Sequence, residues 1–306
     1  MSQSLKTRAL SNVIRFGLRP FLGGRLPYKT QRAMALAATS ICIAPTGMRH
    51  RALTLGGVAG EEVRVDDRAE STLLWLHGGG YCVGSSRTDR AAAGQFAKAS
   101  GARVIVPDYR LAPEHPHPAA LEDALAVYRA LIDQGQDTNK LILGGDSAGG
   151  GLALALAVEL RDKGLPLPAG MVLFSPWVDL RNVQDSHRSR AAEDPWLSTA
   201  MLNNWAAAYC GKTPTDTPSC SPLLAELHDL PPAFIQVGER EILLDDAVEL
   251  DRKLQSSGVQ SDLHIYPEMW HVFFLQAGLL TEADRAVTDI GRFVQRRTAT
   301  AHINHE

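Results

Sequence analysis

The fold of this chain is decided by Leu141-Ile-Leu-Gly-Gly-Asp-Ser-Ala-Gly-Gly-Gly-Leu-Ala-Leu-Ala-Leu156. The stretch predicts a short apolar strand, a turn with Ser147 at its tip, and a helix. Residues 145–149 fit the G-x-S-x-G pattern of a nucleophile elbow, in which a sharp strand-to-helix turn exposes the serine. Gly145 and Gly149 carry no side chain, so strand and helix can pass closely there. A glycine-rich helix start with a capping serine would read the same way, so the rest of the chain must decide.

A second informative stretch is His77-Gly-Gly-Gly-Tyr81, which follows a predicted strand over residues 72–76. Consecutive glycines let backbone N–H groups approach a substrate, as an oxyanion hole after the third strand requires. We expect the N–H groups of Gly79, Gly80 and Ala148 to surround the oxygen that becomes negative during acyl transfer. His77 lies at the root of the loop and precedes the serine, which favours a role in ordering the loop.

The bulk composition excludes several classes of protein. With 306 residues, 45% hydrophobic and 21% charged, the chain is neither disordered nor fibrous. A net charge of −3 provides no general attraction to nucleic acid. No run approaches the roughly 20 apolar residues of a membrane span. The four cysteines lack metal-binding or disulfide spacing, which favours free thiols in a reducing compartment and predicts a cytoplasmic protein.

Charge is distributed unevenly along the chain. Residues 1–60 contain nine Lys and Arg residues and no acid, and the first acid is Glu61. Arg15 and Arg19 interrupt every apolar run that could form a secretory signal. A transit peptide and a membrane-surface anchor stay open as alternatives. Apolar residues at helical spacing favour a pair of amphipathic helices, Leu5–Phe21 and Lys29–Ile43, that cover the body of the fold.

Apolar periodicity predicts strands that alternate with helices from residue 52 onward. Strands are expected at residues 52–55, 62–65, 72–76, 103–106, 141–143, 171–174, 233–237 and 261–266. Helices are expected at residues 118–134, 147–163, 242–257 and 282–297. This alternation predicts an α/β fold with a mostly parallel sheet of eight strands flanked by helices. Such sheets bind ligands beyond the carboxyl ends of their strands.

One interval, residues 181–230, breaks this rhythm because it has no strand pattern. Its larger apolar side chains recur at helical spacing, namely Trp196, Met201, Leu202, Trp205 and Tyr209. We interpret 181–230 as a cap insertion that packs with the N-terminal helices of residues 1–48 over the site. Residues 49–180 and 231–306 then form the core. We expect Trp205 and Tyr81 to contact substrate, although the stripe of aromatic residues could equally be core.

Three motifs together resemble the bacterial hormone-sensitive-lipase-like (family IV) esterases of the α/β-hydrolase superfamily. They are His77-Gly-Gly-Gly-Tyr81, Pro107-Asp-Tyr-Arg-Leu-Ala-Pro-Glu114 and Gly145-Asp-Ser-Ala-Gly149, with Ser175-Pro-Trp-Val-Asp179 a further similar stretch. The resemblance spans residues 72–271. It implies an eight-stranded hydrolase core with a helical cap, built from the N-terminus and from an insertion after the sixth strand.

The middle motif is expected to serve structure. Asp108, Arg110 and Glu114 can form a buried ion network under the end of the sheet. The peptide bonds before Pro113 and Pro118 are candidates for the cis form.

For this fold, the acid and then the histidine follow the serine along the chain. His271 follows the eighth strand by five residues, at the end of the sheet where Ser147 emerges, and we assign it as the base. Among the other C-terminal histidines, His264 lies inside a strand and His302 and His305 lie in the tail. His228 is a further candidate by position in the chain.

The acid is harder to assign. The resembling family has Asp-x-Leu-x-Asp after the seventh strand, and the matching positions here are Glu241, Leu243 and Asp245. A glutamate therefore holds the place of the catalytic aspartate. It can accept the imidazole N–H and stay ionised, so we assign Glu241, with Asp245 and Asp246 as alternatives.

These residues predict a serine carboxylic-ester hydrolase that works through an acyl-enzyme. The small, helical, Trp-containing cap and the family resemblance imply short- to medium-chain acyl esters as substrates. A lactone hydrolase with the same triad and a non-catalytic ligand-binding hydrolase fold are the alternatives. No phosphate loop, H-E-x-x-H motif or Cys/His cluster is present in the sequence, so no cofactor or metal is implied. The eighth strand should form a sheet edge, which predicts a homodimer.

Overall fold

The computed structural model describes residues 5–21 and 26–299. Its centre is one eight-stranded sheet with the order β1-β2-β4-β3-β5-β6-β7-β8. The strands are β1 (Arg49–Leu55), β2 (Val58–Arg64), β3 (Thr72–Leu76), β4 (Arg103–Pro107), β5 (Leu141–Asp146), β6 (Gly170–Phe174), β7 (Ala233–Gly238) and β8 (Ser261–Tyr266). β2 runs antiparallel to both β1 and β4, whereas all pairs from β4 to β8 are parallel. The predicted α/β fold with a mostly parallel sheet is confirmed.

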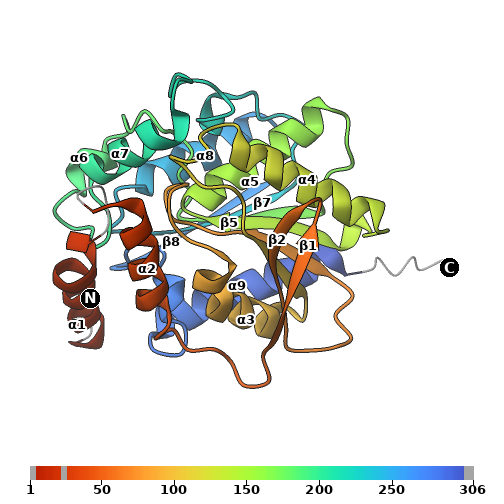
Figure 1. Cartoon of the computed structure of the whole chain (residues 1–306), viewed down its shortest axis with the longest axis horizontal. Helices are drawn as coiled ribbons and strands as arrows, with labels where there is room; N and C mark the ends of the chain where they lie inside the picture. The colour runs from red at the N-terminus through yellow and green to blue at the C-terminus, as the bar shows by residue number, and fades with distance from the viewer. Residues whose placement is uncertain (1–4, 22–25, 300–306) are drawn as a thin grey trace.

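Helices cover both faces of the sheet (Figure 1). Helices α3 (Ser86–Ser100) and α9 (Thr281–Thr298) lie on one face, and α4 (Ala119–Asp133), α5 (Ala148–Asp162) and α8 (Leu244–Ser256) lie on the other. Each face encloses its own apolar cluster. The four strands β3, β5, β6 and β7 are buried along their whole length, which explains their continuous apolar runs.

Helix α3 is absent from the sequence-based prediction. Its signals are local: Ser85 and Thr88 form a reciprocal capping box at its start, and Gly101 ends it with φ of 74°. The helix contains no long apolar residue except Phe96, so its apolar periodicity is weak. Its other buried apolar side chains are alanines, and Gly94 lies against Pro45 and Met48.

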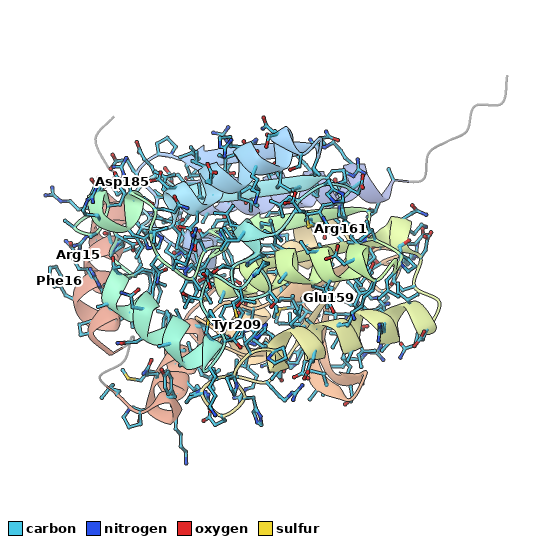
Figure 2. The ribbon with its side chains drawn as sticks, turned by 90° about the horizontal axis from the view of Figure 1, so that it is seen from above. Arg15, Phe16, Glu159, Arg161, Asp185 and Tyr209 are labelled. Atoms are coloured by element: carbon cyan, nitrogen blue, oxygen red, sulfur yellow. The ribbon has the colours of Figure 1, made fainter. Side chains whose placement is uncertain are left out.

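The N-terminal segment and the insertion meet at one end of the molecule. Helices α1 (Leu5–Val13) and α2 (Tyr28–Thr39) belong to the first, and α6 (Ser186–Ser189) and α7 (Thr199–Cys210) to the second. Figure 2 shows Arg15 and Asp185 at that end. Arg15 donates hydrogen bonds to the carbonyl oxygens of Ala192 (2.8 Å) and Glu193 (2.8 Å). That the two segments form a cap distinct from the core stays a prediction, and residues 1–4, 22–25 and 300–306 of the assigned segments lie outside the described residues.

The Pro107–Glu114 motif differs in part from expectation. Both predicted cis bonds, Ala112–Pro113 and His117–Pro118, are present. The predicted buried ion network is wrong, because all three charged side chains are exposed and each has partners elsewhere. Asp108 accepts from Ser86, Arg110 pairs with Glu122 and Asp123, and Glu114 pairs with Arg32.

Candidate active site

Ser147 stands on a strained turn between β5 and α5. Its φ of 53° and ψ of −124° lie in a region that non-glycine residues rarely occupy. A Cβ atom on Gly149 would lie 1.9 Å from the carbonyl oxygen of Leu76, and one on Gly145 would lie 2.3 Å from that of Gly149. Because no side chain fits at either position, both glycines are required for the elbow, which is present as predicted.

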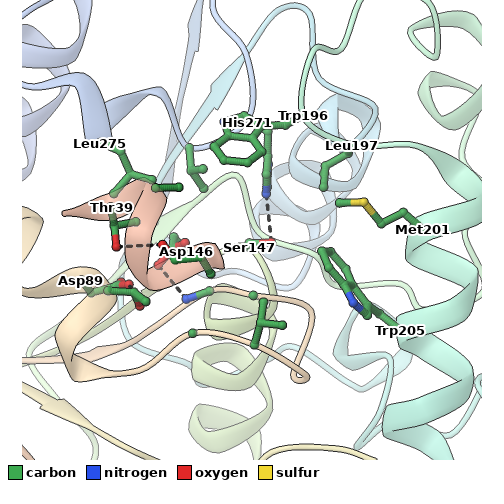
Figure 3. A pocket seen from close by; sticks show the side chains of 18 residues that line it. Thr39, Asp89, Asp146, Ser147, Trp196, Leu197, Met201, Trp205, His271 and Leu275 are labelled. Atoms are coloured by element: carbon green, nitrogen blue, oxygen red, sulfur yellow. Dashed lines mark hydrogen bonds between the residues drawn. The ribbon is translucent and has the colours of Figure 1, made fainter. Parts of the chain in front are cut away.

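His271 and Glu241 continue from Ser147 in a hydrogen-bonded line. The Ser147 Oγ lies 3.0 Å from the His271 Nε2, and the His271 Nδ1 lies 2.8 Å from the Glu241 Oε2 (Figure 3 shows the first of these contacts). Ser147, His271 and Glu241 are 4%, 4% and 0% exposed. His271 comes from the loop after β8 and Glu241 from the loop after β7. A hydroxyl, an imidazole and a carboxylate in this order form the geometry of nucleophile, base and orienting acid.

The second oxygen of Glu241 is also held. Its Oε1 accepts hydrogen bonds from the Ser175 Oγ (2.6 Å) and from the Gly238 N–H (2.6 Å). These two donors fix the rotation of the carboxylate. Ser175 therefore supports Glu241, a role that the sequence alone did not reveal. The position of Ser175 directly after β6, at the start of the Ser175-Pro-Trp-Val-Asp179 stretch, was the sequence feature that could have indicated it.

The two alternative acids point to the insertion. The Asp245 Oδ2 accepts from the Ser186 N–H (2.8 Å). The Asp246 Oδ2 lies 2.8 Å from the His187 Nε2 in a fully buried pair. Both residues lie in the first turn of α8, one turn beyond Glu241. The structure therefore brings Glu241, and neither aspartate, to His271.

The glycine loop after β3 lies beside Ser147. Gly79 lines the cavity above the serine, and Gly80, with φ of 59°, lies against the indole of Trp205. A Cβ atom on Gly80 would lie 2.3 Å from that ring. Ala148 is the first residue of α5, whose opening N–H groups have no acceptor within the helix. The three predicted oxyanion donors thus come from two segments that flank Ser147.

His77 orders this loop, as its position suggested. Its imidazole is buried, stacks on Tyr109 at a centroid distance of 4.2 Å, and contacts the Gly78 carbonyl oxygen through Nδ1 (2.8 Å). The Tyr109 hydroxyl donates to the His77 carbonyl oxygen (2.7 Å). The Gly78 N–H donates to the Asp146 Oδ1 (3.0 Å). The backbone of residues 77 and 78 is therefore held by Tyr109 and by Asp146.

Asp146 and Asp89 form a buried pair of carboxyl groups at one side of the cavity (Figure 3). Burial raises the pKa of Asp146 well above its ordinary value, and the negative charge of Asp89 raises it further. Burial also raises the pKa of Asp89, which accepts hydrogen bonds from the Trp75 Nε1 (3.2 Å) and the Thr88 Oγ1 (3.0 Å). Two carboxylates so close in a buried site cannot both ionise without cost, so the pair retains a proton.

Replacing Asp146 by asparagine is expected to change how stability depends on pH. A raised pKa in the folded state stabilises the protein below the ordinary pKa of about 4, and this gain is lost as pH rises through the raised value. Asparagine keeps an oxygen for the Gly78 N–H and carries no charge. The melting temperature of Asp146→Asn should therefore rise relative to wild type between about pH 4 and pH 8, measured by circular dichroism.

The matched control is Asp216→Asn, at an exposed position. Its melting temperature should follow that of the wild type at every pH. A difference between Asp146→Asn and wild type that stays constant across the range would contradict the prediction.

A cavity of about 110 Å³ opens above Ser147 and His271. Most of its lining is apolar. Helix α2 contributes Ala35, Ala38 and Thr39 to the lining. The insertion contributes Trp196, Leu197, Met201 and Trp205, and the segment after β8 contributes Val272 and Leu275. Trp205 lies where the sequence predicted it, in the wall. The α2 residues were missed, because small side chains give no sequence signal for a binding wall.

The prediction that Tyr81 contacts substrate is wrong. Its ring is 2% exposed and stacks on Tyr209 at a centroid distance of 3.7 Å, and it does not line the cavity. The reason is the path of the backbone: Gly80 and Tyr81 both have φ of 59°, which turns the tyrosine into the core. Among the residues that the structure describes, no group of three or more His, Cys, Asp or Glu side chains is placed to hold a metal ion.

Comparisons with known proteins agree with this geometry. Residues 73–275 match a protein family described as having the alpha/beta hydrolase fold. An acetyl-hydrolase of Streptomyces hygroscopicus is 42% identical over 248 residues, which is 81% of this chain and 82% of that protein. An esterase of Acinetobacter venetianus is 37% identical over 245 residues, covering 79% and 80%.

A solved structure extends the likeness to the tertiary level. The crystal structure of an esterase from the bacterial hormone-sensitive lipase family matches with a TM-score of 0.93 and 37% identity, over 97% of this chain and 100% of that one. The chain therefore belongs to the α/β-hydrolase fold family, among the esterases of its bacterial hormone-sensitive lipase group.

Proposed function

We propose that this protein is a serine carboxylesterase that cleaves short- to medium-chain acyl esters through an acyl-enzyme. The observation that carries the proposal is the line of hydrogen bonds from Ser147 through His271 to Glu241, at the base of a small apolar cavity. Hydrolysis of the ester to an alcohol and an acid needs no cofactor, because every proton that is transferred can pass through the imidazole of His271.

In the first half of the reaction, the Ser147 Oγ forms a bond to the ester carbonyl carbon while its proton moves to the His271 Nε2. Glu241 stabilises the resulting imidazolium. The carbonyl oxygen, now negative, accepts from the N–H groups of Gly79, Gly80 and Ala148. The bond to the alkoxy oxygen then breaks, and the leaving alcohol takes the proton from His271. Water repeats these steps on the acyl-enzyme and releases the acid and Ser147.

The size of the cavity supports small acyl groups. Apolar cavities of about 150 Å³ accommodate benzene, and this one measures about 110 Å³. Trp205 closes one side, where its indole lies against Gly80. The Streptomyces relative is called an acetyl-hydrolase, which agrees with a preference for short acyl chains.

The test of the proposed function is a panel of p-nitrophenyl esters from acetate to octanoate, together with lactones of graded ring size. Turnover that is highest on the short esters supports the proposal. Preferential lactone turnover would make the protein a lactone hydrolase instead. No turnover, and no labelling of Ser147 by a fluorophosphonate, would leave only a ligand-binding role.

Replacing Trp205 by alanine is expected to lengthen the acyl chains that the enzyme accepts. Each buried methylene contributes about 0.8 kcal/mol, so space for two more should raise the octanoate-to-acetate ratio of kcat/KM by about 10-fold. The measurement is the p-nitrophenyl ester panel. Val183→Ala, at an exposed position in the same insertion, is the control and should leave the ratio unchanged. An unchanged ratio in Trp205→Ala would place the limit on chain length elsewhere.

The proposal retains two further predictions. β8 stands at the edge of the sheet, where a second copy of the chain can pair with it in a homodimer.

No helix in the described part of the chain combines the length and the apolar character that a membrane crossing needs. A cytoplasmic location is proposed from the spacing of the cysteines, as above.

A further inference from the structure

Asp194 is a buried carboxylate that joins two walls of the active site. It lies in the insertion, ahead of α7, and is 0% exposed. Its Oδ1 accepts from the N–H groups of Trp196 (2.8 Å) and Leu197 (3.0 Å), both of which line the cavity. Its Oδ2 accepts from the N–H of Ile242 (3.0 Å), the residue after Glu241. One side chain therefore holds the cavity wall and the segment that carries the acid.

The segment between β7 and α8, residues 239–243, is here called the acid loop. The insertion holds this loop and the start of α8 at two further points. The Ser186 Oγ donates to the Ile242 carbonyl oxygen (2.7 Å), and the Ser186 N–H donates to the Asp245 Oδ2 (2.8 Å). Asp194 and the Ser186 Oγ both hold Ile242, and Asp194 does so at the N–H that is joined directly to Glu241. Displacing Ile242 would displace Glu241 relative to His271.

The N-terminal segment fixes Asp194 from the other side. The Arg19 Nη1 donates to the carbonyl oxygen of Asp194 (3.1 Å), beside the two hydrogen bonds of Arg15 to the preceding carbonyl oxygens. The N-terminal segment, the insertion and the acid loop thus meet at this one residue.

Asp194 also lies within electrostatic reach of His271 and Glu241. All three groups that face its carboxyl oxygens are N–H donors, and such donors favour the ionised form. Burial raises the pKa of Asp194 above its ordinary value; the charge of His271 and the N–H groups of Leu197 and Ile242 oppose this rise, and the charge of Glu241 adds to it. The charged groups around Asp194 are therefore His271 and Glu241, with Arg19 at its backbone.

We propose that Asp194 is a positioning residue for the esterase reaction: it holds the acid loop in register with His271 and adds a second negative charge near that imidazole. The inference rests on the proposed function. Asp194 does not touch the reacting atoms, and it acts through Glu241 and His271. Because its other oxygen holds Trp196 and Leu197, it also couples the shape of the cavity wall to the placement of the acid.

The experiment compares Asp194→Asn and Asp194→Glu with wild type, using p-nitrophenyl butyrate and rates per site titrated with a fluorophosphonate. The asparagine oxygen can still accept from the N–H groups of Trp196 and Leu197. Its NH₂ group then faces the Ile242 N–H, and the negative charge of the carboxylate is lost. We expect kcat to fall by about 10- to 100-fold with little change in KM. The acid limb of the pH profile of kcat/KM should move to lower pH by about 0.5–1 unit, because His271 loses an anionic neighbour.

Asp194→Glu separates charge from position. The longer side chain displaces the oxygens, so kcat should fall, but the charge stays and the acid limb should not move. Glu193→Gln is the matched control, since Glu193 is adjacent and pairs with Arg190 away from the site. It should change neither quantity.

Each outcome decides the proposal. An acid limb that stays in place in Asp194→Asn, or that moves equally in both variants, overturns it. A lack of titratable sites in Asp194→Asn also overturns it, because the residue would then be needed for folding. A wild-type protein without ester turnover refutes the proposed function instead, and is recognised before any variant is made.

Discussion

Replacing Ser147 by alanine is expected to lower kcat on p-nitrophenyl butyrate by about 10⁶-fold. The proposed reaction needs a covalent acyl-enzyme, and in this variant only water remains as a nucleophile, because among the described residues no hydroxyl other than that of Ser147 is hydrogen-bonded to the His271 ring. The glycine loop and α5 stay in place, so a residual rate above that in water should persist from the oxyanion donors alone. Steady-state kinetics measures the loss, and mass spectrometry should find no fluorophosphonate adduct.

The matched control is Ser256→Ala. Ser256 is an exposed serine near the end of α8, and its hydroxyl bonds only a carbonyl oxygen of its own helix. Its kinetics should match those of the wild type. Both variants should keep the far-ultraviolet circular dichroism of the wild type. A Ser147→Ala variant within about tenfold of wild-type kcat would refute the proposed nucleophile.

Replacing Glu241 by glutamine should lower kcat by about 10⁴-fold with little effect on stability. The amide oxygen can keep the contacts with Ser175 and the Gly238 N–H. The amide N–H₂ group then faces the His271 Nδ1, so the imidazole must carry its proton on Nε2. In that tautomer His271 cannot accept the proton of Ser147. Kinetics at several pH values checks the loss.

Two further variants make the assignment of the acid specific. Glu241→Asp keeps the charge on a shorter side chain and should retain more activity than Glu241→Gln. Asp245→Asn removes the alternative acid, whose carboxylate accepts from Ser186, and should leave kcat within about tenfold of wild type. A harmless Glu241→Gln combined with an inactive Asp245→Asn would reverse the assignment.

Local patterns in the sequence were enough to predict most of the core and two members of the triad. Strand β3 and strand β8 have the predicted bounds, because each lies between clear breaks in the apolar pattern. The elbow at Ser147 was recognisable because its glycines are steric requirements of the turn itself. His271 followed from the order of the chain and from its place just after β8. Such features depend on a few neighbouring residues, and a sequence displays them directly.

Other features depended on contacts between residues far apart in the chain. Glu241 and Asp245 were both acceptable acids by spacing, and only the fold decided that Asp245 faces Ser186 while Glu241 faces His271. Tyr81 stands next to the glycine loop, yet its backbone conformation directs it to Tyr209. Helix α3 was missed because its buried face is made of small residues.

The sequence by itself therefore determined the fold class, the proposed nucleophile and base, and the presence of a glycine loop beside them. The tertiary structure alone decided which carboxylate faces His271, which side chains line the cavity, and that Asp194 connects that lining to the acid loop. The physical reason is that a hydrogen bond needs a donor and an acceptor that face each other at about 3 Å. Spacing along a chain restricts which residues can meet, but packing across the sheet decides which of them do.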